Sequence, residues 1–258
     1  MSKAEALFDL SGKVALITGG NSGIGLGIGR GLAQCGASVA IAARRVDRTA
    51  AAAAELAELG VRAIPLALDV ADAASVERAF AALEQQLGRL DILVNNSGIN
   101  IRKPAHDLTL AEWTRIININ LTGAFLCSKA AYPLLKRNGA GKIINIGSMM
   151  SLFGASYSPA YGASKGGIVQ LTKSLAMAWA ADNIQVNAIL PGWIDTELTQ
   201  QARIDVPGLN EMVLDRTPAG RWGRPEDMAG VGVFLASAAS NFVTGAAIPV
   251  DGGYASKG

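Results

Sequence analysis

Three side chains that could transfer a proton lie close together in the middle of the sequence. Tyr161 and Lys165 are four residues apart, and Ser148 lies thirteen residues before Tyr161. On a helix, a spacing of four residues places the phenol and the ammonium group on one face. A neighbouring cation favours the phenolate, so a phenol with an ordinary pKa of ~10 could exchange protons nearer neutral pH. This arrangement predicts a general acid/base that interconverts an alcohol and a carbonyl.

A glycine-rich segment near the N-terminus could bind a phosphate group. Residues 18–25 read Thr-Gly-Gly-Asn-Ser-Gly-Ile-Gly, and they follow an apolar run that is typical of a strand. Gly19 permits a tight turn, while Gly23 and Gly25 let the backbone approach a pyrophosphate closely. The helix expected next would offer free N–H groups and a positive dipole to that phosphate. The segment lacks the Gly-Lys-Ser/Thr ending of an ATP or GTP loop, which argues against phosphoryl transfer.

Short apolar runs alternate with helical patterns along the chain. Strands are expected at residues 14–18, 38–43, 62–68, 90–94, 142–146, 184–190 and 246–250. Helices are expected after the glycine-rich segment to about residue 35, and at 47–59, 73–87, 110–135 (with a break near 120–123), 160–181 and 225–237. This alternation predicts one α/β domain over residues 1–258, a doubly wound parallel sheet with helices on both faces. Residues 195–216 lack an apolar period, and we expect them to form a mobile substrate lid.

The composition excludes several classes of protein. Half of the 258 residues are hydrophobic and the net charge is +2, which predicts a packed globular protein without a nucleic-acid or membrane partner. One histidine and two distant cysteines, Cys35 and Cys127, make a metal site improbable and suggest a reduced compartment, although a disulfide remains open. The first residues lack the apolar run of a signal peptide, and the uncharged stretches 143–164 and 228–250 contain Gly, Ser and Asn. We therefore expect a cytoplasmic protein.

Taken in order, these motifs closely resemble the short-chain dehydrogenase/reductase family, whose fold is of the Rossmann type. The resemblance runs from residue 12 to residue 253, and the family's Asn-Asn-Ala-Gly motif appears at 95–98 with Ser97 in place of alanine. It implies that Tyr161 is the general acid/base and that Ser148 holds the substrate oxygen. Lys165 would lower the pKa of Tyr161 and bind the nicotinamide ribose. Asn120 would organise a water-linked proton relay towards Lys165.

The resemblance also implies which residues bind the cofactor. These are Gly19, Asn21, Ser22, Gly23, Ile24, Gly25, Arg44, Asp69, Val70, Asn95, Gly98, Tyr161, Lys165, Pro191, Gly192, Ile194 and Thr196. Pro191 and Gly192 would lie beside the nicotinamide, with Ile194 and Thr196 at its carboxamide. Asp69 would contact the adenine with Val70, or would instead belong to the start of a helix.

The end of the second strand indicates which nicotinamide cofactor is preferred. An acidic residue there binds the ribose 2′-hydroxyl of NAD, whereas an arginine accommodates the 2′-phosphate of NADP. Ala43 occupies the expected position, and Arg44 and Arg45 follow it. A guanidinium group can bond a phosphate through its planar fork, so we predict that NADP(H) is preferred and NAD(H) is possible. The alternative is that both arginines are solvated surface charges, and Ser22, where some NADP-preferring relatives have a basic residue, weakens the prediction.

The sequence says least about the substrate. Residues 141–146, Ser148 with Met149, and residues 216–223 resemble the gluconate 5-dehydrogenase and 2-deoxy-gluconate 3-dehydrogenase branch of the family. This favours a sugar, sugar acid or polyol, with Arg102 either pairing with a carboxylate or lying on a solvated rim. A 3-oxoacyl-carrier-protein reductase and a non-catalytic nucleotide-sensing protein are the alternatives. The resemblance also implies a homotetramer, with residues 110–135 and 160–181 at one interface and the last strand at another.

Overall fold

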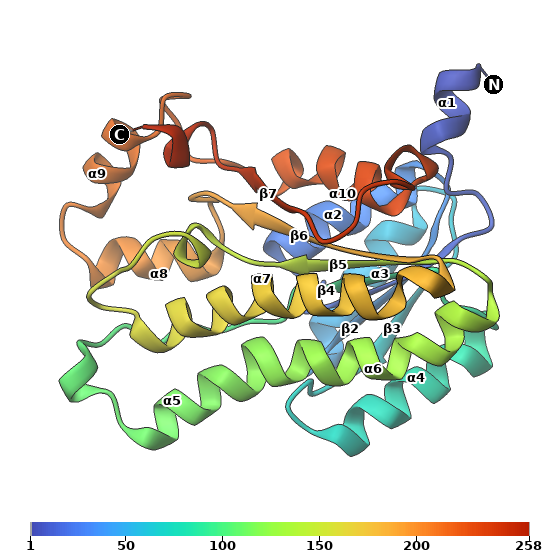
Figure 1. The fold of residues 1–258 in the computed structure, drawn as a ribbon, viewed down its shortest axis with the longest axis horizontal. Coiled ribbons are helices and arrows are strands. Elements are labelled where there is room, and N and C mark those ends of the chain that lie inside the picture. Colours follow the sequence, from blue (N-terminus) through green and yellow to red (C-terminus); the bar gives the residue numbers. More distant parts are fainter. Residues whose placement is uncertain (1, 258) are drawn as a thin grey trace.

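The computed structural model describes residues 2–257, which fold around one sheet of seven parallel strands (Figure 1). The strand order is β3-β2-β1-β4-β5-β6-β7, so the chain winds outward in both directions from the β1–β4 pair. This is the doubly wound parallel sheet that the sequence predicts. The strands are β1 Val14–Thr18, β2 Ser38–Ala43, β3 Ala63–Ala67, β4 Ile92–Asn95, β5 Gly141–Ile146, β6 Ile184–Pro191 and β7 Ala247–Val250.

The central strands are enclosed because helices cover both faces of the sheet. β1, β4, β5 and β6 are buried at every residue, so even their polar residues Lys142, Asn145, Gln185 and Asn187 are shielded from water. β3 lies at the edge and alternates between buried and exposed positions. The apolar runs of the sequence therefore identify the middle of the sheet.

Two hydrophobic clusters fill the spaces between the sheet and its helices. One cluster contains side chains of α4, α6 and α7, and the other contains side chains of α2, α3 and α10. Figure 1 shows these two groups of helices on opposite faces of the sheet. The α-helices are α1 Lys3–Phe8, α2 Gly23–Gln34, α3 Val46–Ala57, α4 Ala73–Leu87, α5 Leu110–Ile117, α6 Gly123–Arg137, α7 Pro159–Trp179, α8 Glu197–Asp205, α9 Leu209–Arg216 and α10 Ala229–Ala236.

Two of the predicted helices are interrupted. The break expected near residues 120–123 is a π-helical turn, Asn118–Thr122, between α5 and α6. The helix expected at 225–237 begins as a 3₁₀ turn, Pro225–Met228, and becomes α-helical only at α10. The first interruption matters most, because it carries Asn120.

Residues 195–216 contain two helices, α8 and α9, although the sequence showed no helical period there. Ala202, Leu209 and Val213 are buried together, packed against Trp193 and Trp222. These helices are stabilised by contacts with residues outside the segment, which a local periodicity cannot reveal. Among residues 2–257, no helix combines the length and apolar composition needed to cross a bilayer.

Candidate functional site

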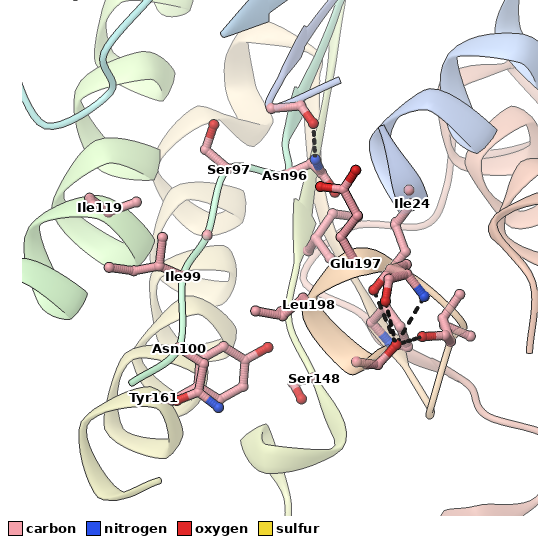
Figure 2. A pocket seen from close by; sticks show the side chains of 18 of the residues that line it. Ile24, Asn96, Ser97, Ile99, Asn100, Ile119, Ser148, Tyr161, Glu197 and Leu198 are labelled. Carbon is pink, nitrogen blue, oxygen red and sulfur yellow. Dashed lines mark hydrogen bonds between the residues drawn. The ribbon is translucent and has the colours of Figure 1, made fainter. Parts of the chain in front are cut away.

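A cleft of about 750 Å³ opens at the carboxyl ends of the strands. Its wall is formed by the start of α2, the segments that follow β2, β4 and β5, the start of α7, and α8 (Figure 2). In an open α/β sheet this edge is where ligands bind. The sequence-predicted residues on this wall are Gly19, Asn21, Ser22, Gly23, Ile24, Arg44, Asp69, Val70, Gly98, Ser148, Tyr161, Lys165, Pro191, Gly192, Ile194 and Thr196.

Ser148, Tyr161 and Lys165 all line this cleft. Pro159 begins α7, a position that suits its fixed φ angle, and the first two turns carry Tyr161 and Lys165. Ser148 lies just beyond β5, where its hydroxyl accepts a hydrogen bond of 3.1 Å from the backbone of Met150. Figure 2 shows Ser148 and Tyr161 in the same part of the cleft. A strand end and a helix start therefore position the three groups.

Burial dominates the protonation of this pair. It raises the pKa of the Tyr161 phenol above its ordinary value, while a hydrogen bond with Ser148 and the charge of Arg102 lower it to a smaller extent. Burial also lowers the pKa of Lys165 to about 8. The pKa of Tyr161 is thus raised, whereas the sequence led us to expect a lowered pKa. The reason is that low-polarity surroundings disfavour the charged form of both groups.

Asn120 lies behind the cleft and supports one of its loops. Its Oδ1 accepts a hydrogen bond of 2.8 Å from the backbone N–H of Ile99, and its Nδ2 donates to the Ile99 carbonyl and to Ser164 Oγ, both at 3.0 Å. The side-chain amide is thus engaged with the loop that follows β4. The proton relay implied for Asn120 stays a prediction. Because the side-chain amide is already hydrogen-bonded, the backbone of this residue would have to take part in the relay.

The glycine-rich turn fits a phosphate group. Gly19 and Gly23 have φ angles of +63° and +55°, in the left-handed region that glycine tolerates. The N-cap residue of α2, Ser22, makes no side-chain capping bond, which leaves the N–H groups of the first turn available. A Cβ on Gly98 would project to 3.7 Å from Lys165 Nζ. The residues present therefore fit a dinucleotide: the first turn of α2 would hold its pyrophosphate, and Lys165 would hold its nicotinamide ribose.

Two of the residues predicted to bind the cofactor lie behind the wall instead of on it. Asn95 Nδ2 donates to Ser128 Oγ of α6 and to Asn145 Oδ1 of β5. A Cβ on Gly25 would lie 2.5 Å from Asn96 Nδ2, so this glycine permits close packing of the loop. Both residues pack against protein atoms and support the wall, and their contact with the cofactor stays a prediction.

The structure adds Asn96, which the sequence reasoning passed over. It lies on the cleft wall, and its Nδ2 donates to the carbonyl oxygens of Thr18 and Gly19 at 3.1 and 2.9 Å. These bonds hold the glycine-rich turn against the segment after β4. Its place beside Asn95 in the family motif was the available signal.

The part of the cleft where the adenosine ribose of the cofactor is expected contains cations and one unexpected carboxylate. Arg44 and Arg45 line the cleft after β2, with Ala43 where an NAD-binding acid would stand. Glu197, from the start of α8, also lines the cleft and is hydrogen-bonded to Arg48. No local signal marks this pairing, because the partners are 149 residues apart. Asp69, also on the wall, accepts a bond from the Ala71 backbone, as expected for the turn before α4.

Arg102 and its partners connect two segments of the cleft wall. The side chain is only 10% exposed, and it donates to Asp205 Oδ2 at 3.1 Å and to the Leu198 carbonyl at 3.2 Å. Asp205 and Leu198 both belong to α8, so this arginine links the loop after β4 to the candidate lid. In the part of the chain that the structure describes, no cluster of three metal-ligating side chains occurs.

The chain is similar to named dehydrogenases and reductases over nearly its whole length, and like them it is an NAD(P)-dependent oxidoreductase that acts on a CH–OH group. Residues 19–255 match the family model described as enoyl-(acyl carrier protein) reductase. The chain belongs to the short-chain dehydrogenase/reductase family.

Relatives of similar length include enzymes that are named for gluconate derivatives. A 2-dehydro-3-deoxy-D-gluconate 5-dehydrogenase of Dickeya dadantii is 42% identical over 97% of this chain and 98% of its own. One from Formosa agariphila is 40% identical over 96% of this chain and 94% of its own. The crystal structure of a gluconate 5-dehydrogenase from Burkholderia cenocepacia, in complex with NADP and tartrate, has a TM-score of 0.93. It is 40% identical and covers 98% of this chain and 99% of its own.

Proposed function

We propose that this protein interconverts a secondary alcohol and a ketone on a sugar acid, with NADP(H) as the preferred cofactor. The observation that carries the proposal is Arg102, a largely buried cation on the wall of the same cleft as Ser148 and Tyr161. Arg102 uses one N–H toward Asp205 and one toward the Leu198 carbonyl, and its remaining N–H donors can bind a substrate carboxylate. The names of the similar enzymes, which act on gluconate derivatives, point to the same substrate class.

The side chains divide the work of proton transfer. In reduction, the neutral phenol of Tyr161 donates a proton to the carbonyl oxygen, and in oxidation its phenolate accepts one from the alcohol. Ser148 would hydrogen-bond the same oxygen and stabilise the charge that develops on it. When bound, the nicotinamide supplies the hydride donor or acceptor. The raised pKa of Tyr161 suits the proton-donating direction near neutral pH.

Lys165 and Asn120 would act around this pair. Lys165 Nζ donates to the Ile146 carbonyl at 2.6 Å, which leaves it further donors for a ribose hydroxyl. Asn120 holds the Ile99 backbone, which borders the cleft. Together they would fix the distance between the cofactor ribose and Tyr161.

The preference for NADP(H) rests on the residues after β2. Ala43 offers no carboxylate to a ribose hydroxyl, and the exposed side chains of Arg44 and Arg45 can meet a 2′-phosphate. NAD(H) would bind through the remaining contacts, with the loss of this ion pairing. Solved relatives that contain NADP support the same choice.

A substrate panel tests the proposal. Absorbance of reduced nicotinamide is followed with NADP and NAD separately, against sugar acids, polyols and 3-oxoacyl thioesters. We expect turnover on a sugar acid, with higher kcat/KM for NADP. Turnover on 3-oxoacyl thioesters alone would instead assign the protein to acyl-chain reduction.

We further propose a homotetramer in the cytoplasm, in which residues 195–216 act as a substrate lid. Met177 of α7 and Leu110 of α5 are 83% and 79% exposed, and Phe242, before β7, is fully exposed. Burying these apolar side chains would favour the two expected interfaces. Cys35 and Cys127 are free thiols, in keeping with a reducing compartment. Light scattering after gel filtration tests the assembly, and cell fractionation tests the location.

A further inference from the structure

Glu197 forms an ion pair across the cofactor end of the cleft. It is the first residue of α8, and its carboxylate receives two hydrogen bonds from the Arg48 guanidinium of α3, at 2.6 and 3.2 Å. Arg45 Nη2 lies 3.7 Å from the same carboxylate. The hydrogen bonds from Arg48 lower the pKa of Glu197, so it is ionised at neutral pH. One carboxylate thus neutralises part of the charge of two arginines.

Arg45 lies on the cleft wall where a 2′-phosphate is expected to bind, and Arg48 lies one turn further along α3. Arg45 is the N-cap residue of α3, directly after the strand end that selects the cofactor, and it lines the cleft together with Arg44 and Glu197. Figure 2 shows Glu197 and Leu198 on the wall of this cleft. A Cβ on Gly23 would lie 3.1 Å from Thr196 Cγ2, so the start of α8 rests on the glycine-rich turn. The carboxylate and the phosphate would therefore share one small region.

We propose that Glu197 is a specificity-determining residue, whose negative charge competes with the 2′-phosphate of NADP for Arg45 and Arg48. This inference rests on the proposed use of nicotinamide dinucleotides at this site. NAD has no group there, so Glu197 can keep both arginines when NAD is bound. NADP brings a doubly charged phosphate, which must share the arginines with Glu197 or displace it. Glu197 thereby limits the advantage of NADP over NAD.

Displacing Glu197 would leave α8 attached elsewhere. Asp205, at the other end of α8, is bonded to Arg102, and the buried Ala202 anchors the middle of the helix. The first turn of α8 can therefore respond to the phosphate without release of the whole segment. Because Glu197 is 62% exposed, water and salt screen its charge, and the effect on binding will be moderate.

The test compares cofactor binding in Glu197→Gln and in the parent protein, without substrate. Dissociation constants for NADP, NAD and 2′,5′-ADP are measured by calorimetry. We expect the ratio Kd(NAD)/Kd(NADP) to rise about 3- to 10-fold and 2′,5′-ADP to bind more tightly, with the gain shrinking at high salt. A loosening of α8 would change the dissociation constants of both cofactors. The ratio therefore reports on the 2′-phosphate, which NADP has and NAD lacks.

Asp205→Asn is the matched control, because it removes a carboxylate from the same helix at the substrate end. Its ratio should equal that of the parent protein. An unchanged or lowered ratio in Glu197→Gln, or an equal rise in Asp205→Asn, would overturn the proposal. A protein inactive on every sugar acid would refute the proposed substrate yet leave this binding ratio readable, so the two failures are distinct.

Discussion

Lys165 Nζ donates a hydrogen bond of 2.6 Å to the main-chain carbonyl oxygen of Ile146. Ile146 ends β5, two residues before Ser148, so this bond ties the helix of Tyr161 to the strand that leads to Ser148. Lys165 Nζ lies 5.6 Å from the centre of the Tyr161 ring. The lysine therefore positions the two groups through the backbone and acts on the phenol only through space.

Tyr161→Phe removes the proton donor and leaves the ring. We expect kcat to fall about 10²- to 10⁴-fold, the usual contribution of general acid/base catalysis, while NADP still binds. Steady-state kinetics and fluorescence titration with NADPH check the two parts separately. Undiminished turnover would show that another group transfers the proton. Tyr157→Phe, a neighbouring phenol on the same wall, is the control and should keep most activity.

The raised pKa of Tyr161 predicts that oxidation and reduction depend differently on pH. Oxidation needs the Tyr161 phenolate, and a raised pKa keeps this form scarce at neutral pH. We expect kcat/KM for oxidation to rise about tenfold per pH unit from pH 6 to 8, while reduction stays level. Profiles recorded in both directions check this. An oxidation rate already level at neutral pH would mean that the charge of Lys165 outweighs burial and that the phenol is ionised.

Arg102→Gln should weaken sugar-acid binding selectively. A charge-assisted hydrogen bond contributes about 1.5–3 kcal/mol, so kcat/KM for a sugar acid should fall roughly 10- to 100-fold. For a neutral polyol it should change little. Arg203→Gln is the matched control, since Arg203 lies on α8 but stacks on Trp222 and bonds Asp195. Equal losses on both substrates would assign Arg102 to holding α8 rather than to the carboxylate.

The buried Lys142, which lies outside the cleft, should make the free energy of unfolding depend on pH. Its Nζ is bonded to Ser240 Oγ and Asn241 Oδ1, and burial lowers its pKa to about 8. The unfolded chain, with a pKa near ~10.4, binds more protons above pH 8, so stability rises with pH in that window. Relative to Lys142→Met, the parent protein should gain about 1–2 kcal/mol between pH 7 and 9.5. Urea unfolding at both pH values checks this, and parallel profiles would refute the shift.

The sequence predicted the bounds of a strand or helix correctly where the signals that begin and end it lie within a few residues of those bounds. The predicted strands 14–18 and 38–43 and the predicted helix 73–87 coincide with β1, β2 and α4. Asp72 caps α4 at its start, and Gly88 ends it in the left-handed conformation. These signals lie within a few residues of the boundaries that they set. The helices α8 and α9 were missed because they pack on each other and on Trp193 and Trp222, which lie outside the segment.

The sequence by itself determined the order of the strands and helices and the spacing of Tyr161 and Lys165, because both depend on neighbours along the chain. It also placed the glycines that a tight phosphate-binding turn requires. Only the tertiary structure decided whether the pKa of Tyr161 is raised or lowered, since burial depends on every element around the cleft. It alone paired Arg102 with Asp205 and Arg48 with Glu197, across 103 and 149 residues. Such charges meet only when the sheet brings distant loops to one edge.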